Sequence, residues 1–109
     1  MQAPEYEYSR RWVEEHNPND QTPAADRIFV AYSNHYTAIV AFREGITLRD
    51  VIGQTKAKEK TVRVMILRET DKVAPVFDEV VGPSDRPAFS LKPRDVVWLT
   101  DAPQKGRKP

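Results

Sequence analysis

The chain of 109 residues contains two histidines, the side chains best suited to acid–base chemistry near neutral pH. His35 lies between Asn34 and Tyr36. If a carboxylate lies nearby, His35 would be the acid–base residue of a small enzyme or an enzyme subunit. No serine stands in the glycine-flanked elbow of a hydrolase, and no triad order is present. We therefore predict that His35 is a solvent-exposed turn residue and that the chain has no catalytic residues. The enzyme is kept as an alternative.

The residue types give little support to a metal or cofactor site. The segment HNPND at residues 16–20 places oxygen ligands close together, but it lacks the glycine and the terminal glutamate of a calcium-binding loop. The chain has no cysteine, which excludes disulfides, thiolate catalysis and cysteine-ligated zinc. Its four glycines form no phosphate-binding loop. We expect no metal and no cofactor.

Four arginines and one tryptophan are the candidate partner-binding residues. Seventeen basic and sixteen acidic side chains give a formal net charge of +1, which disfavours nucleic acid as a partner because that affinity depends on many neutralised phosphates. Arg63 alternates with apolar residues, and Arg43 and Arg49 flank the predicted start of a helix. Arg68 and Trp98 complete the set. Trp98 could instead be a core residue. An exposed tryptophan at this position would indicate a binding surface.

These candidates belong to a series of short apolar segments. RIFVAY (27–32) and YTAIVAFR (36–43) are separated by a short polar break and predict a β-hairpin. Three further strands are predicted by TVRVMILRE (61–69), VFDEVV (76–81) and VVWL (96–99). The β-branched and aromatic composition of all five segments is typical of strands.

REGITLRDVIGQT (43–55) predicts the passage from a strand into a helix. Gly45 can take the positive φ that ends the strand, Thr47 is a good N-cap, and Asp50 completes a variant of the capping box. Apolar residues then recur at helical spacing. Gly53 costs the helix stability, and it either permits close packing on the sheet or marks an early end of the helix. The order strand, strand, helix, strand, strand, strand predicts an α+β fold of the β-grasp (ubiquitin-like) type, with one helix packed on a mixed sheet of four to five strands.

Polar segments flank this domain. Residues 1–25 are expected to form a partly flexible N-terminal arm, with a short helical turn that has Ser9 as its N-cap; alternatively, the arm pins Trp12 into the core or onto a partner. The β-grasp domain is expected at 26–101, followed by a disordered basic tail at 102–109. We find no signal peptide and no apolar stretch of membrane-spanning length, so the chain as written is expected in the cytoplasm unless it is an excised domain.

Two stretches resemble the soluble-ligand-binding β-grasp (SLBB) domain of polysaccharide export proteins and several other bacterial proteins. GITLRDVIGQT (45–55) is similar to the G-x-T-L-x-D-A-I junction of that family, and FSLKPRDVVWL (89–99) to its closing L-x-P-G-D-V-V-x-V segment. TVRVMILRE (61–69) stands where the family has a V-x-V-x-R strand. Arg94 replaces the turn glycine of the closing motif. The resemblance covers approximately 36–100 and implies a ligand-binding β-grasp module.

The sequence therefore predicts a non-enzymatic interaction module. A protein partner is the first expectation and a saccharide the second, bound through a sheet face, a sheet edge, or the loops at 69–75 and 82–90. Pairing of two copies at a sheet edge, which would give a homodimer, is a further expectation. Two alternatives are kept: a small regulatory protein of phage or plasmid type that inhibits its target by protein–protein binding, and the small enzyme that uses His35.

Overall fold

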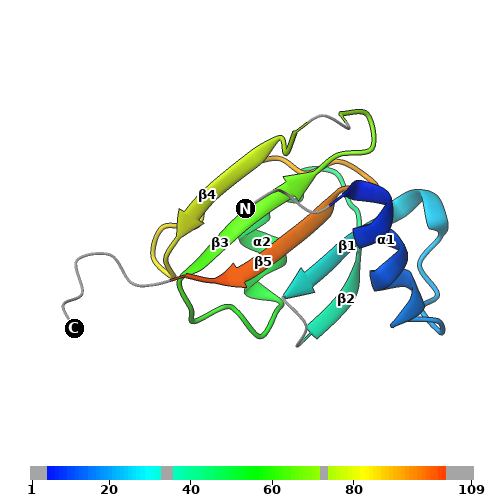
Figure 1. The fold of residues 1–109 in the computed structure, drawn as a ribbon, viewed down its shortest axis with the longest axis horizontal. Coiled ribbons are helices and arrows are strands. Elements are labelled where there is room, and N and C mark those ends of the chain that lie inside the picture. Colours follow the sequence, from blue (N-terminus) through cyan, green and yellow to red (C-terminus); the bar gives the residue numbers. More distant parts are fainter. Residues whose placement is uncertain (1–4, 33–35, 72–73, 103–109) are drawn as a thin grey trace.

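The computed structural model describes residues 5–32, 36–71 and 74–102, which form a five-stranded mixed sheet with a helix on each face (Figure 1). This confirms the α+β class. Of the predicted basic tail, only Ala102 lies within the described residues. The elements are, in chain order, α1 (Tyr6–Glu15), the 3₁₀ helix η1 (Ala24–Asp26), β1 (Arg27–Tyr32), β2 (Tyr36–Ala41), α2 (Leu48–Gly53), β3 (Val62–Leu67), β4 (Phe77–Val81) and β5 (Val96–Asp101).

The strands lie in the order β2-β1-β5-β3-β4. The central strands β1 and β5 are parallel, with Phe29 opposite Val96 and Tyr32 opposite Leu99, whereas the other three pairs are antiparallel. A parallel pair needs a long crossover connection, and here the chain between β1 and β5 contains β2, α2, β3 and β4. The last strand thus completes the middle of the sheet.

Apolar side chains are buried on both faces of the sheet. On one face, side chains from α2 pack against residues from all five strands. On the other face, α1 covers a smaller cluster. The strands β1 and β5 contribute to both, because successive strand residues point to opposite faces. Members of the α2-face core include Ile28, Val30, Leu48, Ile52, Val64, Ile66, Val97 and Leu99, and the α1-face cluster comprises Tyr6, Val13, Phe29, Ala31, Leu67 and Val96.

The junction into α2 has the local structure that its sequence predicts. Gly45 has a φ of 85°. The Thr47 Oγ1 accepts a hydrogen bond from the Asp50 N–H at 3.3 Å, and the Asp50 carboxylate accepts one from the Thr47 N–H at 3.0 Å, which forms a reciprocal capping box. The backbone hydrogen bond lowers the pKa of the Asp50 carboxyl. The helix ends at Gly53, which agrees with the second of the two alternatives for this glycine, and a Cβ atom placed there would meet nothing within 4 Å.

The helix α1 is the main departure from the sequence prediction. It begins at Tyr6 after the N-cap Glu5, whereas a turn starting at Ser9 was expected. Ser9 is fully buried, and its hydroxyl donates to the Glu5 carbonyl oxygen at 2.9 Å instead of capping the helix. The prediction of one packed helix is therefore wrong. Tyr6, Ser9 and Val13 share one side of α1, and that side covers the second apolar face of the sheet.

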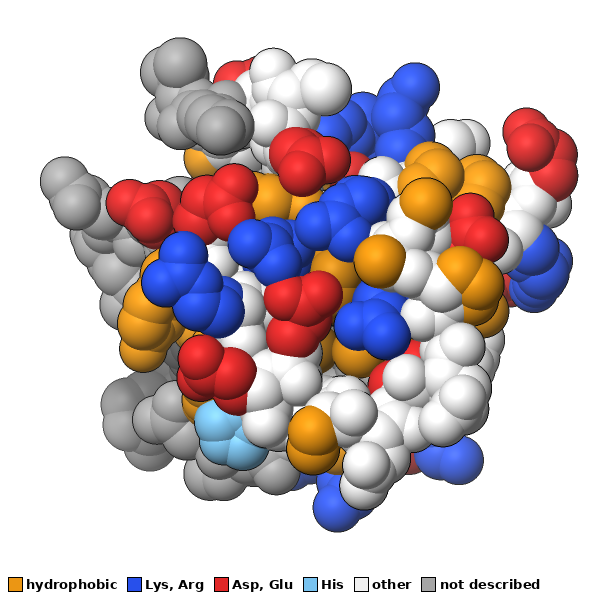
Figure 2. Space-filling model, turned by 90° about the vertical axis from the view of Figure 1, so that its right-hand side faces the viewer, with side chains coloured by type: hydrophobic (Ala, Val, Ile, Leu, Met, Phe, Trp, Pro, Cys, Tyr) orange, Lys and Arg blue, Asp and Glu red, His pale blue; other side chains and the backbone are white. Residues whose placement is uncertain are grey.

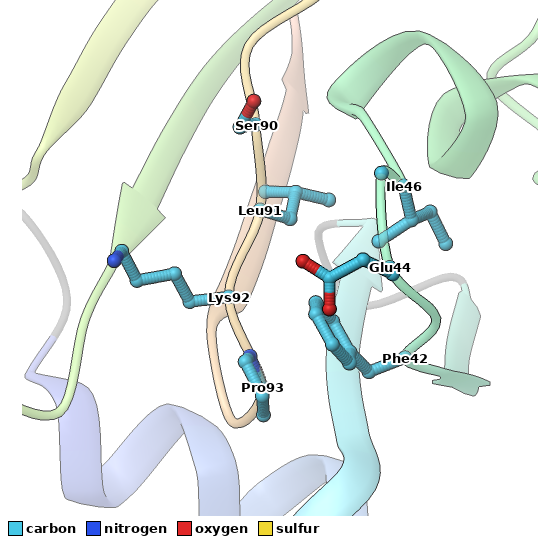
Figure 3. Close-up of a pocket in the computed structure, with 8 residues that line it drawn as sticks. Phe42, Glu44, Ile46, Ser90, Leu91, Lys92 and Pro93 are labelled. Atoms are coloured by element: carbon cyan, nitrogen blue, oxygen red, sulfur yellow. The ribbon is translucent and has the colours of Figure 1, made fainter.

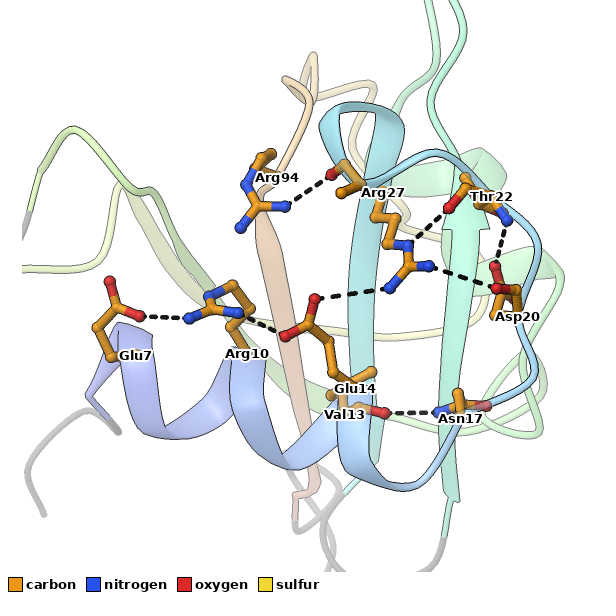
Figure 4. Close-up of polar contacts among 10 residues, drawn as sticks. Glu7, Arg10, Val13, Glu14, Asn17, Asp20, Thr22, Arg27 and Arg94 are labelled. Carbon is orange, nitrogen blue, oxygen red and sulfur yellow. Dashed lines mark hydrogen bonds and ion pairs between the residues drawn. The ribbon is translucent and has the colours of Figure 1, made fainter.

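Ion pairs join α1 to the segment that precedes β1 (Figure 4). Arg10 contacts the carboxylates of Glu7 at 2.7 Å and Glu14 at 2.5 Å, and Glu14 lies 3.6 Å from the guanidinium of Arg27. The Arg27 Nε donates to the Thr22 carbonyl oxygen at 2.8 Å. Acidic and basic side chains are consequently interleaved on this side of the molecule (Figure 2). The network fixes the end of α1 relative to the start of β1.

The turn before β5 has a left-handed residue, Arg94, with a φ of 73°. This conformation costs a residue with a Cβ atom about 1 kcal/mol relative to glycine. Contacts of Arg94 offset that cost: its Nη1 donates to the Ala24 carbonyl oxygen at 2.6 Å, and its guanidinium lies 5.4 Å from the centre of the Phe29 ring. Its own carbonyl oxygen accepts a hydrogen bond from the Tyr6 hydroxyl at 2.6 Å. The turn therefore anchors both η1 and α1.

The strain at Arg94 predicts an order of stability for two variants. Arg94→Ala loses the side-chain contacts and keeps the strained backbone, whereas Arg94→Gly loses the same contacts but removes the strain. We expect the glycine variant to exceed the alanine variant by about 1 kcal/mol in the free energy of unfolding. Urea unfolding measures the difference, and an alanine variant at least as stable as the glycine variant would contradict the interpretation.

Alkaline pH should weaken the attachment of α1. Burial raises the pKa of the Tyr6 hydroxyl to about 12, whereas an unfolded tyrosine has the ordinary value of 10.0. Between these values the unfolded chain binds fewer protons than the folded chain, so the free energy of unfolding falls as pH rises. We expect Tyr6→Phe to make this fall less steep in urea unfolding across that interval. Equal slopes for the variant and the native chain would refute the assignment.

Candidate functional site

Two of the five predicted partner-binding residues lie near the start of α2. The side chain of Arg43 is 65% exposed, and its Nη2 is 4.0 Å from the Asp50 carboxylate. Arg49 is also exposed, and its Nε donates to the Arg86 carbonyl oxygen at 3.1 Å. Both arginines therefore reach solvent beside the first turn of the helix.

Two further arginines are held in bidentate ion pairs. Arg68 bonds both carboxylate oxygens of Asp95, at 2.9 and 2.8 Å, and Asp95 is fully buried. This hydrogen bonding raises the pKa of the Arg68 guanidinium. Arg63 bonds both oxygens of Asp78, at 2.9 and 2.8 Å, in a half-exposed pair between β3 and β4. Arg68 thus links the end of β3 to the residue that precedes β5, whereas Arg63 lies on the surface of the sheet.

The fifth candidate, Trp98, lies under α1. Its ring is partly buried and packs against Trp12, with 5.7 Å between the ring centres. Trp12 also contacts the His16 ring edge-on at 5.3 Å. Trp12 therefore packs onto the sheet through Trp98. This agrees with the alternative prediction that the arm pins Trp12 into the core.

The five candidates do not form one site. Arg63 and Arg68 are five residues apart on and just after β3, roughly 16 Å along a strand, and the odd spacing directs their side chains to opposite faces. Arg43 and Arg49 lie at a third place, beside α2. His35, the residue of the enzyme alternative, lies outside the described residues, as do positions 72–73 of the loop at 69–75.

The two edges of the sheet differ in what flanks them. At β2, the Asn17 Nδ2 donates to the Thr37 Oγ1 at 3.0 Å, so the chain between α1 and β1 is tied to that strand. At the other edge, β4 pairs with β3 alone among the described residues, and no other labelled element lies along its far side in Figure 1. Unpaired strand edges offer backbone groups to another chain.

The hydrogen-bond alternation of the sheet identifies which β4 groups face outward. The Ala102 N–H donates to the Thr61 carbonyl oxygen, so the odd-numbered residues of β3 bond to β5 and the even-numbered ones bond to β4. In the β3–β4 register, Val64 lies opposite Glu79, and Glu79 therefore bonds inward. The N–H and C=O groups of Asp78 and Val80 are directed away from β3. Both residues are exposed, Val80 by 47%.

A separate hollow of about 500 Å³ lies between the chain that follows β2 and the chain that precedes β5 (Figure 3). Phe42, Ile46 and Leu91 give it an apolar lining. The Glu44 side chain is directed toward the segment 90–93, whereas the Lys92 side chain points away from the hollow (Figure 3). The hollow thus offers one carboxylate over an apolar wall.

Sequence analysis missed Arg86, the most important residue of the loop at 82–90. Arg86 is only 8% exposed, and its Nη2 donates to the carbonyl oxygens of Ala57, Lys58 and Lys60 at 3.0, 3.0 and 2.9 Å. Burial lowers the pKa of this guanidinium, which nevertheless stays protonated at neutral pH. No sequence signal distinguishes it, because an arginine next to proline in a polar segment is typical of an exposed loop.

Replacing Arg86 should cost much more stability than replacing the exposed Arg63. Arg86→Met removes the donors and leaves three carbonyl groups without that partner, at about 1 kcal/mol or more for each. We expect a loss of about 3 kcal/mol in the free energy of unfolding, measured with urea. Arg63→Met is the matched control, because a half-exposed ion pair contributes little. Similar losses for the two variants would contradict the structural role of Arg86.

No family model, curated protein or solved structure matches this chain. Among the described residues, no helix is long and apolar enough to span a membrane. Over the same ranges, no group of three or more histidine, aspartate or glutamate side chains is placed to hold a metal ion. The open edge of β4 is the surface whose chemistry is best defined by the geometry.

Proposed function

We propose that this chain is a non-enzymatic interaction module of the β-grasp type that binds a protein partner by strand addition at β4. The order β2-β1-β5-β3-β4, with α2 between the two hairpins in sequence, supports the β-grasp arrangement. The single observation that carries the binding proposal is the β4 edge, where the backbone groups of Asp78 and Val80 face outward. An extended segment of a partner could form main-chain hydrogen bonds there.

The β4 edge is favoured over the β2 edge because three of the five residues of β4 are exposed, whereas five of the six residues of β2 are half-buried. The Asn17 side chain also donates a hydrogen bond to the Thr37 hydroxyl of β2. A protein segment is favoured over a saccharide for a related reason. The outward groups of β4 are spaced for a polypeptide backbone, since alternate residues along a strand repeat their direction. Arg63 is the one predicted binding residue that lies beside this edge.

The proposal can be tested with Val80→Pro. Proline removes the outward N–H of residue 80 and adds a ring at the edge, but it takes no hydrogen bond from the β3–β4 ladder. We expect proteins captured from a lysate by the native chain to be lost with Val80→Pro. We also expect the Asp78 and Val80 amides to exchange rapidly in the free chain and to become protected when a captured protein is added.

Val80→Thr is the matched control, because it keeps the N–H and a β-branched side chain. It should retain every captured protein. Urea unfolding of both variants checks that the domain remains folded. Strand addition at β4 would be overturned by captured proteins that bind Val80→Pro as well as the native chain, or by protection that appears elsewhere and leaves residues 78 and 80 unchanged.

A further inference from the structure

We infer that the segment added to β4 alternates basic and apolar residues, an inference that rests on the proposed strand addition. Three acidic residues surround the edge: Asp78 and Glu79 on β4, and Asp85 in the turn that follows. Arg63 is the basic residue of the β3–β4 surface. Arg86 follows Asp85 in the same turn, and its Nη1 donates to the Val81 carbonyl oxygen of β4. Three negative and two positive groups give this edge a formal charge of −1, opposite in sign to the +1 of the whole chain.

The three acidic residues differ in how much charge they leave for a partner. Asp78 is already bound by the guanidinium of Arg63 through two hydrogen bonds, which lower the pKa of its carboxyl. Glu79 is exposed and lies opposite the apolar Val64 of β3. Asp85 is exposed, and its N–H donates to the Gly82 carbonyl oxygen in the turn. Glu79 is therefore the carboxylate best placed to meet a cation on an added strand.

The alternation of the added strand follows from the faces of β4. Glu79 shares the α2 face with Val64, whereas Val80 lies opposite Arg63 on the other face and is 47% exposed. Directly opposed residues on neighbouring strands lie close enough to interact, and opposite charges there are favourable. A basic residue opposite Glu79 and an apolar residue opposite Val80 are neighbours in the added segment. The pattern is the same for parallel and antiparallel addition.

The same geometry disfavours a second copy of this chain as the occupant. A two-fold pairing that places Asp78 opposite Val80 of the other copy also places the two Glu79 side chains directly opposite each other. Like charges in that position are destabilising. Shifting the register to bring the outward-facing Asp78 residues together opposes two carboxylates again. A pairing centred on Val80 avoids like charges but places the apolar Val81 opposite Glu79, whereas a basic segment places a cation there.

The test uses the full chain with ¹⁵N labelling and the heptapeptide Val-Lys-Val-Lys-Val-Lys-Val. We expect the peptide to shift the backbone amide signals of β4, and the binding to weaken as salt is added. Val-Glu-Val-Glu-Val-Glu-Val should cause no such shifts. In the lysine peptide, N-methylation of the valines should abolish antiparallel addition, because the valine N–H groups face β4 in that arrangement. In parallel addition the lysine N–H groups face β4, and N-methylation of the lysines should abolish binding instead.

The variant Glu79→Gln should weaken binding of the lysine peptide roughly two- to fivefold, the effect of losing one cross-strand charge pair. Glu15→Gln, at an exposed position of α1, is the matched control and should leave binding unchanged. Equal shifts of the β4 amides by the lysine and glutamate peptides would overturn the charge preference and leave strand addition standing. Failure of the strand-addition proposal has a different signature: the captured proteins would still bind Val80→Pro.

Discussion

The parallel pairing of β1 with β5 is the constraint on which the rest of the structure depends. The pair joins the N-terminal hairpin to β5, which in turn pairs with β3 of the β3–β4 hairpin. Because both strands are apolar on both faces, each face of the sheet must be covered. The helix α2 covers one face and α1 covers the other. The centre of the sheet therefore dictates a three-layer arrangement, and the outer strands are left at open ends of the sheet.

Local sequence patterns predicted those parts of the fold that are decided locally. Gly45, Thr47 and Asp50 specify the entry into α2 through backbone conformation and capping, which need no distant partner. The helix α1 was underestimated because its apolar side is interrupted by Ser9, a residue that is polar in sequence and buried in the fold. Arg86 is likewise a polar residue that is buried in the fold, and its sequence context did not predict this. Its three carbonyl acceptors are 26 to 29 residues away in sequence, and no short motif records such a contact.

The candidate site had a different difficulty. The arginines were selected as charged residues without a packing role, yet Arg68 has the buried Asp95 as its partner and only Arg63 lies beside the open edge. An edge is a property of strand order, since the same sequence of β4 in the middle of a sheet would offer no free backbone groups. The position of β4 at the end of the order therefore could not be read from its own residues. What the sequence does supply is the charge of that edge, through Asp78 and Glu79.

The buried guanidinium of Arg86 also has a consequence for the order of folding events. Residues 54–60, between α2 and β3, contain no regular helix or strand, and their carbonyl groups find a common donor only when Arg86 arrives from beyond β4. We therefore expect this connection to form late in folding, because the loop between it and Arg86 must close first. Substitutions there should accelerate unfolding and leave the refolding rate nearly unchanged, the behaviour of residues whose contacts are absent from the transition state.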